Sequence, residues 1–120
     1  MPMHDDLKPL LHPAEPLFVS PDASILDAIR VIDAGTQQIA IAVDESRHLV
    51  GVVTDGDIRR AILRGIELSG PVSQILNRKP TVCKRTATRE ELARTLLGQE
   101  RITRLPVVDD QGNVLGLYRT

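Results

Sequence analysis

The chain has 120 residues, the length of one ordinary domain, and its 42% hydrophobic and 26% charged residues are typical of a folded protein rather than a disordered chain. Fifteen basic and sixteen acidic residues leave a formal net charge of −1, which argues against nucleic acid or an anionic membrane as a partner. No stretch approaches the roughly 20 apolar residues that span a bilayer, and the N-terminus lacks the pattern of an export signal. We therefore expect a cytoplasmic protein.

Cysteine, aromatic and histidine residues are scarce. The single Cys83 excludes an intrachain disulfide and most cysteine-based metal sites, and its apolar neighbours predict a small core residue rather than a nucleophile. Phe18 and Tyr118 are the only aromatic residues, too few to stack single-stranded nucleic acid. The histidines are far apart in the sequence, and we expect them on the surface rather than as metal ligands or catalytic bases: His4, His12 and His48.

The first part of the chain reads as an extension followed by a strand and a helix. Residues 1–17 carry four prolines, too many for a long helix, although a single turn around 5–11 is compatible with them. A short strand at 18–19 leads through a turn to a helix over 25–35, which Ser24 caps. The predicted buried face of this helix consists of aliphatic residues: Ile25, Ala28, Ile29 and Ile32.

Two apolar strands and a second helix follow. The strands are predicted over 39–43 and 49–53, joined by a tight connection. The helix is predicted over 57–65 and presents one face at helical spacing: Ile58, Ala61, Ile62 and Gly65. A further short helix is expected over 72–76, after Pro71 in the first-turn position that proline tolerates.

The same pattern then recurs. A short strand at 81–83 precedes a helix over 88–99, whose apolar face is predicted to contain Leu92, Ala93, Leu96 and Leu97, and further strands are expected over 105–108 and 114–118. Val43 and Gly51 recur as Val108 and Gly116, each 65 residues later. The chain is therefore predicted to be an α/β protein with tandem β-α-β-β-α repeats.

We place repeat 1 over 18–77 and repeat 2 over 78–120, after an N-terminal extension over 1–17. The second copy is incomplete, because the sequence stops at Arg119 and Thr120, where a strand should turn into its second helix. We therefore expect the chain to be a fragment of a longer protein.

The junction from Thr54 to Asp57 allows two interpretations. A strand that becomes a helix presents free backbone N–H groups, which suit an anionic or hydroxyl-bearing ligand. The same spacing fits a capping box, in which the two side chains satisfy the backbone and bind nothing. Arg59 and Arg60 are predicted in the first helical turn, where a bound phosphate or the nearby Asp55 would offset their charge. Asp55 and Asp57 alone supply too few ligands for Mg²⁺.

A duplicated unit of this size, closed in its first copy by Gly51-Val52-Val53-Thr54-x-x-Asp57, resembles a pair of cystathionine-β-synthase (CBS) domains, also called a Bateman module. The second copy contributes the matching run 104–109, Arg-Leu-Pro-Val-Val-Asp. More narrowly, residues 51–61 together with residues 71–77 resemble the CBS pairs found N-terminal to bacterial sugar-phosphate nucleotidyltransferases. The catalytic domain would then begin shortly after residue 120.

The resemblance implies a pseudo-twofold pair that binds an adenosyl nucleotide such as AMP, ADP or ATP between its sheets, with no fixed cofactor or metal. Asp57 would accept hydrogen bonds from ribose hydroxyls, and Thr54 would contact ribose or phosphate. The opposite wall would come from the second copy: Thr81, Val82, Thr103, Arg104, Leu105 and Pro106. Arg59, Arg60 and Arg104 are either phosphate partners or solvated surface charges.

A second cleft is implied more weakly, because its Thr-x-x-Asp is missing from this chain and Arg119 stands near the threonine position. Its lining residues would be Val19, Ser20, Ile39 and Ala40.

Three functions follow as hypotheses. The first is a non-catalytic module that senses an adenine nucleotide and modulates an attached nucleotidyltransferase. The second is a structural module without ligand that forms a homodimer through the helices over 25–35 and 88–99. The third, an independent enzyme, is disfavoured because no activated nucleophile can be assembled from these residues.

Overall fold

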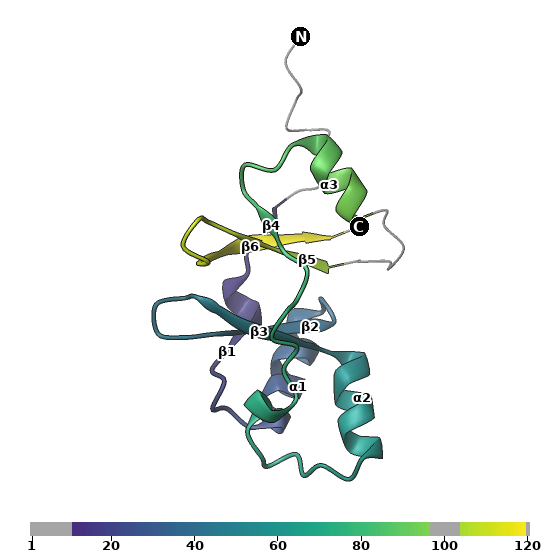
Figure 1. The fold of residues 1–120 in the computed structure, drawn as a ribbon. Helices are drawn as coiled ribbons and strands as arrows, with labels where there is room; N and C mark the ends of the chain where they lie inside the picture. Colours follow the sequence, from purple (N-terminus) through teal and green to yellow (C-terminus); the bar gives the residue numbers. More distant parts are fainter. Residues whose placement is uncertain (1–10, 97–103, 120) are drawn as a thin grey trace. The chain divides into compact units, whose positions relative to one another are not determined.

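The computed structural model describes residues 11–96 and 104–119 (Figure 1). These residues form two compact units, which we describe separately. The first unit is Glu15–Pro80, and the second unit joins residues 11–14 to the described residues from Thr81 onward. Each unit contains one three-stranded sheet.

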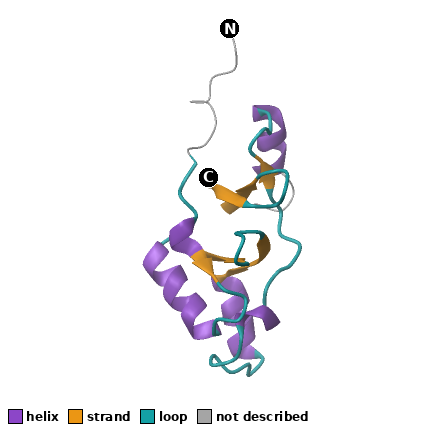
Figure 2. Ribbon diagram, turned by 90° about the vertical axis from the view of Figure 1, so that its left-hand side faces the viewer, coloured by secondary structure: helices purple, strands orange, loops and turns teal. Residues whose placement is uncertain are grey.

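The first unit has the strand order β1-β2-β3, in which β1 runs parallel to β2 and β2 runs antiparallel to β3. Helices α1 and α2 lie on the same face of this sheet (Figures 1 and 2). Its elements in chain order are the 3-10 turn η2 (Glu15–Leu17), β1 (Phe18–Val19), α1 (Ile25–Gly35), β2 (Ile39–Val43), β3 (Leu49–Thr54), α2 (Asp55–Leu63) and the 3-10 turn η3 (Val72–Gln74).

The first helix forms for the reasons that the sequence indicates. The Ser24 hydroxyl accepts a hydrogen bond from the Asp27 N–H at 3.0 Å, and Thr36 ends the helix in the left-handed region at φ 56°. The inward residues of α1, α2 and η3 pack with alternate residues of the strands in one core: Val19, Ile25, Ala28, Ile32, Ala40, Ala42, Val53, Ile58 and Val72.

The second unit repeats this topology with the strand order β4-β5-β6. Cys83 pairs with Val107 as Phe18 pairs with Ile41, both in parallel register. Its elements are β4 (Cys83–Lys84), α3 (Arg89–Leu96), β5 (Arg104–Val108) and β6 (Val114–Arg119). The predicted α/β fold with tandem repeats is confirmed, and Cys83 lies in the core of this unit with Ala87, Leu92, Leu105, Val107 and Tyr118.

In each unit a short chain segment packs over the last strand. We call it the crossing segment, and it contains Asn77 in the first unit and His12 in the second. In the first unit, Asn77 forms an isolated antiparallel bridge with Val52 of β3. In the second unit, His12 forms the corresponding bridge with Leu117 of β6, which lies 65 residues after Val52. The described end of the predicted extension, residues 11–14, therefore pairs with the second repeat.

Several element boundaries differ from the prediction. The second helix begins at Asp55 rather than at residue 57, because Thr54 already caps it. Arg60 consequently lies in the last turn of this nine-residue helix, where a positive charge is favourable, and the prediction of a first-turn arginine pair was wrong. Ile62 is 52% exposed and does not belong to the buried face.

Two further elements differ from the prediction. The predicted helix over 72–76 is the shorter 3-10 turn η3, and the predicted strand at 81–83 is β4, which begins two residues later and ends one residue later. Ala93 is exposed, whereas Leu92 of α3 lies in the buried core. Leu97 and residues 5–10 of the predicted turn over 5–11 lie outside the described residues. No helix within 11–96 or 104–119 is long and apolar enough to cross a membrane.

Candidate functional site

The junction of β3 and α2 contains a complete capping box. The Asp57 N–H donates to the Thr54 hydroxyl at 3.4 Å, and the Thr54 N–H donates to Asp57 Oδ2 at 2.9 Å. The Thr54 hydroxyl also donates to Asp57 Oδ2 at 3.1 Å. Of the two interpretations of this spacing, the cap is therefore realised in the structure, and the same contacts fix the orientation of both side chains.

The carboxylate of Asp57 has a third donor. Arg60 Nη2 lies 2.7 Å from Asp57 Oδ1, and the two side chains are 61% and 24% exposed, respectively. A carboxylate offers about four acceptor positions, so one remains for a further donor. Arg59, the neighbouring arginine of this helix, is exposed. The structure thus brings Thr54, Asp57 and Arg60 together.

The predicted residues of the second unit lie around the start of β5. Arg104 is the first residue of this strand and pairs with Arg119 of β6, while Leu105 and Pro106 are buried. The parallel register of β4 with β5 puts Thr81 and Val82, just before β4, toward the same end of the strand. Thr103 lies outside the described residues.

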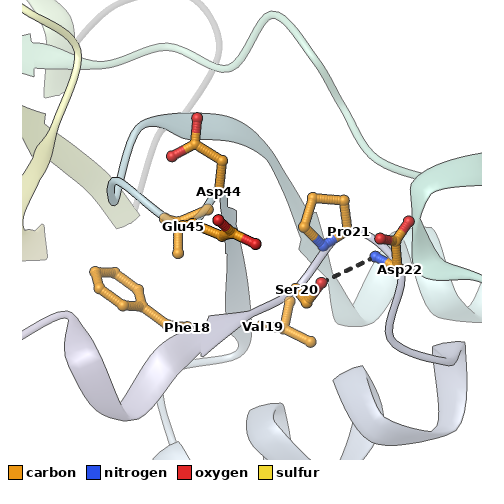
Figure 3. Close-up of a pocket in the computed structure, with 8 residues that line it drawn as sticks. Phe18, Val19, Ser20, Pro21, Asp22, Asp44 and Glu45 are labelled. Carbon is orange, nitrogen blue, oxygen red and sulfur yellow. Dashed lines mark hydrogen bonds between the residues drawn. The ribbon is translucent and has the colours of Figure 1, made fainter.

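The residues of the weaker predicted cleft separate into two groups. Val19 and Ser20 line an open hollow of about 550 Å³ at the end of β1 and β2 (Figure 3). Ile39 and Ala40 are buried at the opposite end of β2 and do not line this hollow. The remaining lining residues are Phe18, Pro21, Asp22, Val43, Asp44 and Glu45.

Two acidic residues beside this hollow take part in local turns, Asp44 through its carboxylate and Asp22 through its backbone N–H. Asp44 Oδ1 accepts the N–H groups of His48 and Ser46, both at 2.9 Å, and these bonds, that from His48 foremost, lower the pKa of the Asp44 carboxyl below its usual value. The Asp22 N–H donates to the Ser20 hydroxyl at 3.2 Å. Within the described ranges, no group of three or more His, Cys, Asp or Glu side chains is arranged to hold a metal ion.

The comparison with protein families matches both repeats. The model of the CBS domain matches residues 10–64 and again residues 72–119. The two matched segments follow the two structural units except at residues 11–14, which belong to the second unit, and at residues 72–80, which belong to the first.

Several curated proteins are similar in sequence. An uncharacterized protein of Helicobacter pylori is 34% identical over 92% of this chain and 34% of its own length. The arabinose 5-phosphate isomerase GutQ of Escherichia coli O6:H1 is 32% identical over 78% of this chain and 29% of its own length. The inosine-5'-monophosphate dehydrogenase of Methanocaldococcus jannaschii is 31% identical over 84% of this chain and 19% of its own length. The chain thus spans about a third or less of these relatives.

Two solved structures illustrate the fold. CBSX2 in complex with AMP, a protein of Arabidopsis thaliana, is 27% identical with a TM-score of 0.77, and the match covers 91% of this chain and 85% of that one. The CBS domain pair of MJ0100, in complex with 5'-methylthioadenosine and S-adenosylmethionine, has a TM-score of 0.76 at 22% identity, covering 95% and 86%.

Proposed function

Because this chain belongs to the CBS domain family, as a pair of CBS repeats, we propose that it is a regulatory module that binds an adenosyl nucleotide at the junction of β3 and α2. The observation that carries the proposal is the fixed, partly exposed carboxylate of Asp57. Three donors already hold it, and its remaining acceptor position suits a ribose hydroxyl. Capping and ligand binding are therefore compatible roles for this residue.

The first turn of α2 supports an anionic or hydroxyl-bearing ligand. The N–H groups of Asp55 and Gly56 lie in this turn and have no acceptor inside the helix. Thr54 stands beside them as the N-cap, so its hydroxyl can contact ribose or phosphate. Arg59 and Arg60 are the proposed phosphate partners from this helix, although Arg60 must share its guanidinium with Asp57.

The rest of the proposed site comes from the second repeat. Its residues are those that the family resemblance assigns to the opposite wall: Thr81, Val82, Thr103, Arg104, Leu105 and Pro106. A second ligand site at Val19, Ser20, Ile39 and Ala40 is the weaker part of the proposal, because only the first two of these residues line a common hollow.

The ligand class is supported by the solved structures of relatives. CBSX2 was crystallised with AMP, and the MJ0100 pair with S-adenosylmethionine and 5'-methylthioadenosine. All three compounds share an adenosyl group, and a ribose with free hydroxyls is the part that a carboxylate such as Asp57 recognises.

Calorimetric titration of the chain tests this proposal. We expect heat of binding with at least one of AMP, ADP, ATP or S-adenosylmethionine, and loss of that binding in Asp57→Ala. Asp57→Asn retains an acceptor for the Thr54 N–H, so it separates the charge from the cap. Absence of both heat and thermal shift at ligand concentrations of about 1 mM would remove the sensing function.

The attached enzyme is a further part of the proposal. We infer a sugar-phosphate nucleotidyltransferase from the sequence of residues 51–61 and 71–77. A sugar-phosphate isomerase is the second candidate, because GutQ is 32% identical to this chain. Assays of nucleotidyl transfer and of isomerisation in the longer protein, each with and without AMP, would distinguish them and give the sign of regulation.

A module that only assembles a homodimer is the alternative function. Exposed apolar side chains on α1 and α2 favour it: Leu26 at 40%, Ile62 at 52% and Leu63 at 79%. Sedimentation of the native chain and of Leu63→Lys tests for such a dimer. If the Asp57→Ala variant remains a dimer and the native chain shows no effect of any ligand, the results favour the homodimer module over the nucleotide-binding module.

A further inference from the structure

A hollow of about 330 Å³ lies beside α2, within the first unit. One wall is formed by three residues of α2 and by the C-cap residue Arg64, and the other wall by the last residue of η3 and the three residues that follow it. Its volume falls at the lower end of the range for small-molecule sites, about 300–1,000 Å³. The lining residues are Asp57, Arg60, Ala61, Arg64, Gln74, Ile75, Leu76 and Asn77.

Two arginines line this hollow. Arg60 lies in the last turn of α2 and Arg64 is the C-cap residue of that helix, four residues later, so their like charges repel each other. Arg60 is paired with Asp57, but the Arg64 guanidinium has no hydrogen bond or ion pair to any residue in the part of the chain that the structure describes. The lining charges sum to a net positive value, and an anion held between the guanidinium groups would relieve their repulsion.

Groups that recognise hydroxyls surround the same space. The Asp57 carboxylate accepts hydrogen bonds, and the amides of Gln74 and Asn77 both donate and accept. The Asn77 carbonyl oxygen of the side chain already accepts the Lys79 N–H at 3.1 Å, which leaves its amide nitrogen as a donor. Arginines beside a carboxylate and two amides match a ligand that has a phosphate at one end and hydroxyls at the other.

The wall opposite α2 is fixed by backbone pairing. The Asn77 N–H donates to the Val52 carbonyl at 2.9 Å, and the Val52 N–H donates to the Asn77 carbonyl at 3.0 Å. This pairing joins the segment to β3, which leads directly into α2. A site whose two walls are already held together loses little conformational entropy when a ligand enters.

We propose that this hollow binds a small phosphate ester that carries hydroxyl groups, the size of a pentose phosphate. Arg64, assisted by Arg60, binds the phosphoryl group, while Asp57, Gln74 and Asn77 bind the hydroxyls. The ligand is either a free sugar phosphate or the ribose phosphate of a nucleotide, which share this chemistry. The site shares Asp57 and Arg60 with the proposed adenosyl site but depends on Arg64, which that site does not use.

Calorimetric titration with ribose 5-phosphate, ribose, adenosine and AMP tests the proposal. We expect ribose 5-phosphate to bind, ribose to bind far more weakly, and Arg64→Gln to weaken ribose 5-phosphate by about tenfold or more. Arg30→Gln is the matched control, because Arg30 is an exposed arginine on α1 outside the hollow. It should change the affinity by less than about twofold.

The outcomes separate the two ligand sources and the two proposals. Equal sensitivity of AMP and ribose 5-phosphate to Arg64→Gln, with competition between them, assigns the hollow to a nucleotide's ribose phosphate. If Arg64→Gln weakens the binding of ribose 5-phosphate but not that of AMP, the hollow is a site for a free sugar phosphate. Failure of ribose 5-phosphate to bind at about 10 mM, or an equal loss in Arg30→Gln, overturns the hollow as a phosphate site. Adenosine binding in that case leaves the adenosyl site standing.

Discussion

Gly51 of β3 lies directly against the backbone of Asn77, and a Cβ atom at position 51 would stand 2.7 Å from the Asn77 carbonyl oxygen. The second unit contains the same relationship, because a Cβ atom at Gly116 would lie 2.9 Å from the His12 carbonyl oxygen. Both glycines are required by a chain segment that crosses the last strand, not by their backbone angles. The glycine of the repeated motif therefore serves the fold, while Thr54, three residues later, begins the candidate site.

Substitution of Gly51 by alanine should destabilise the protein. The new methyl group meets backbone, which cannot rotate away, so we expect a loss of about 1–3 kcal/mol in the free energy of unfolding. Urea denaturation with a fixed m-value measures this loss.

Gly56→Ala is the matched control for this substitution. Its Cβ atom would meet only the flexible end of the Arg60 side chain, at 3.3 Å, and alanine favours a helix. We expect no loss of stability from Gly56→Ala. Equal losses in the two variants would contradict the role of the crossing segment.

The repeated fold could be predicted because it depends on local patterns. The recurrence of Val43 and Gly51 after 65 residues identified the duplication, and each repeat formed its own sheet and core. The crossing of β6 by His12 could not be predicted, because it joins residues about a hundred positions apart and leaves no periodic signal. The structure reveals it through the His12–Leu117 bridge and the close approach at Gly116.

Removal of the Thr54 hydroxyl should weaken α2. Thr54→Ala deletes the acceptor of the Asp57 N–H and one donor to its carboxylate, and loss of such a cap costs about 0.5–2 kcal/mol. Thermal unfolding measures the change. Thr54→Ser keeps the hydroxyl and should stay close to the native stability, and a serine variant as unstable as the alanine variant would contradict the capping role.

The two hairpins differ at one position that the duplication relates. Gly112 adopts φ 85° in the turn between β5 and β6, and Arg47, 65 residues earlier, adopts φ 67° in the turn between β2 and β3. Arg47 is held there by Glu15 at 3.2 Å and lies over the Phe18 ring at 5.8 Å. The first repeat thus places an arginine in the left-handed backbone conformation that glycine adopts in the second repeat.

Gly112→Ala should therefore destabilise the second unit. A left-handed conformation costs an L-residue about 1–2 kcal/mol, and alanine has no side-chain contact to offset it. Asparagine tolerates this region better, so Gly112→Asn should lose less. Chemical denaturation of both variants measures the difference. Identical behaviour of alanine and asparagine would show that the turn does not require the left-handed angle.

The candidate site was predicted in part. The Thr54-x-x-Asp57 spacing identified both the cap and the carboxylate, since a capping box is local in sequence. The place of Arg64 beside the hollow was not predicted, because its relation to Gln74 and Asn77 depends on where the segment around η3 returns against α2. Its spacing of four from Arg60 was the only signal that the sequence contained.

The stability of the β2–β3 hairpin should depend on pH through Asp44. Hydrogen bonds from the His48 and Ser46 N–H groups lower the pKa of the Asp44 carboxyl in the folded state below its ordinary value of 3.8. Above that value the carboxylate is charged in both states and its full stabilisation is present, and it is lost as the pH falls through the lowered folded-state pKa. Asp44→Ala should therefore be less stable than the native chain at pH 7, and this deficit should shrink below pH 3.8. Asp44→Asn, which keeps an acceptor but cannot ionise, is the control, and urea denaturation across the acid range measures all three proteins. A deficit of Asp44→Ala that stays constant with pH would contradict the involvement of the charge.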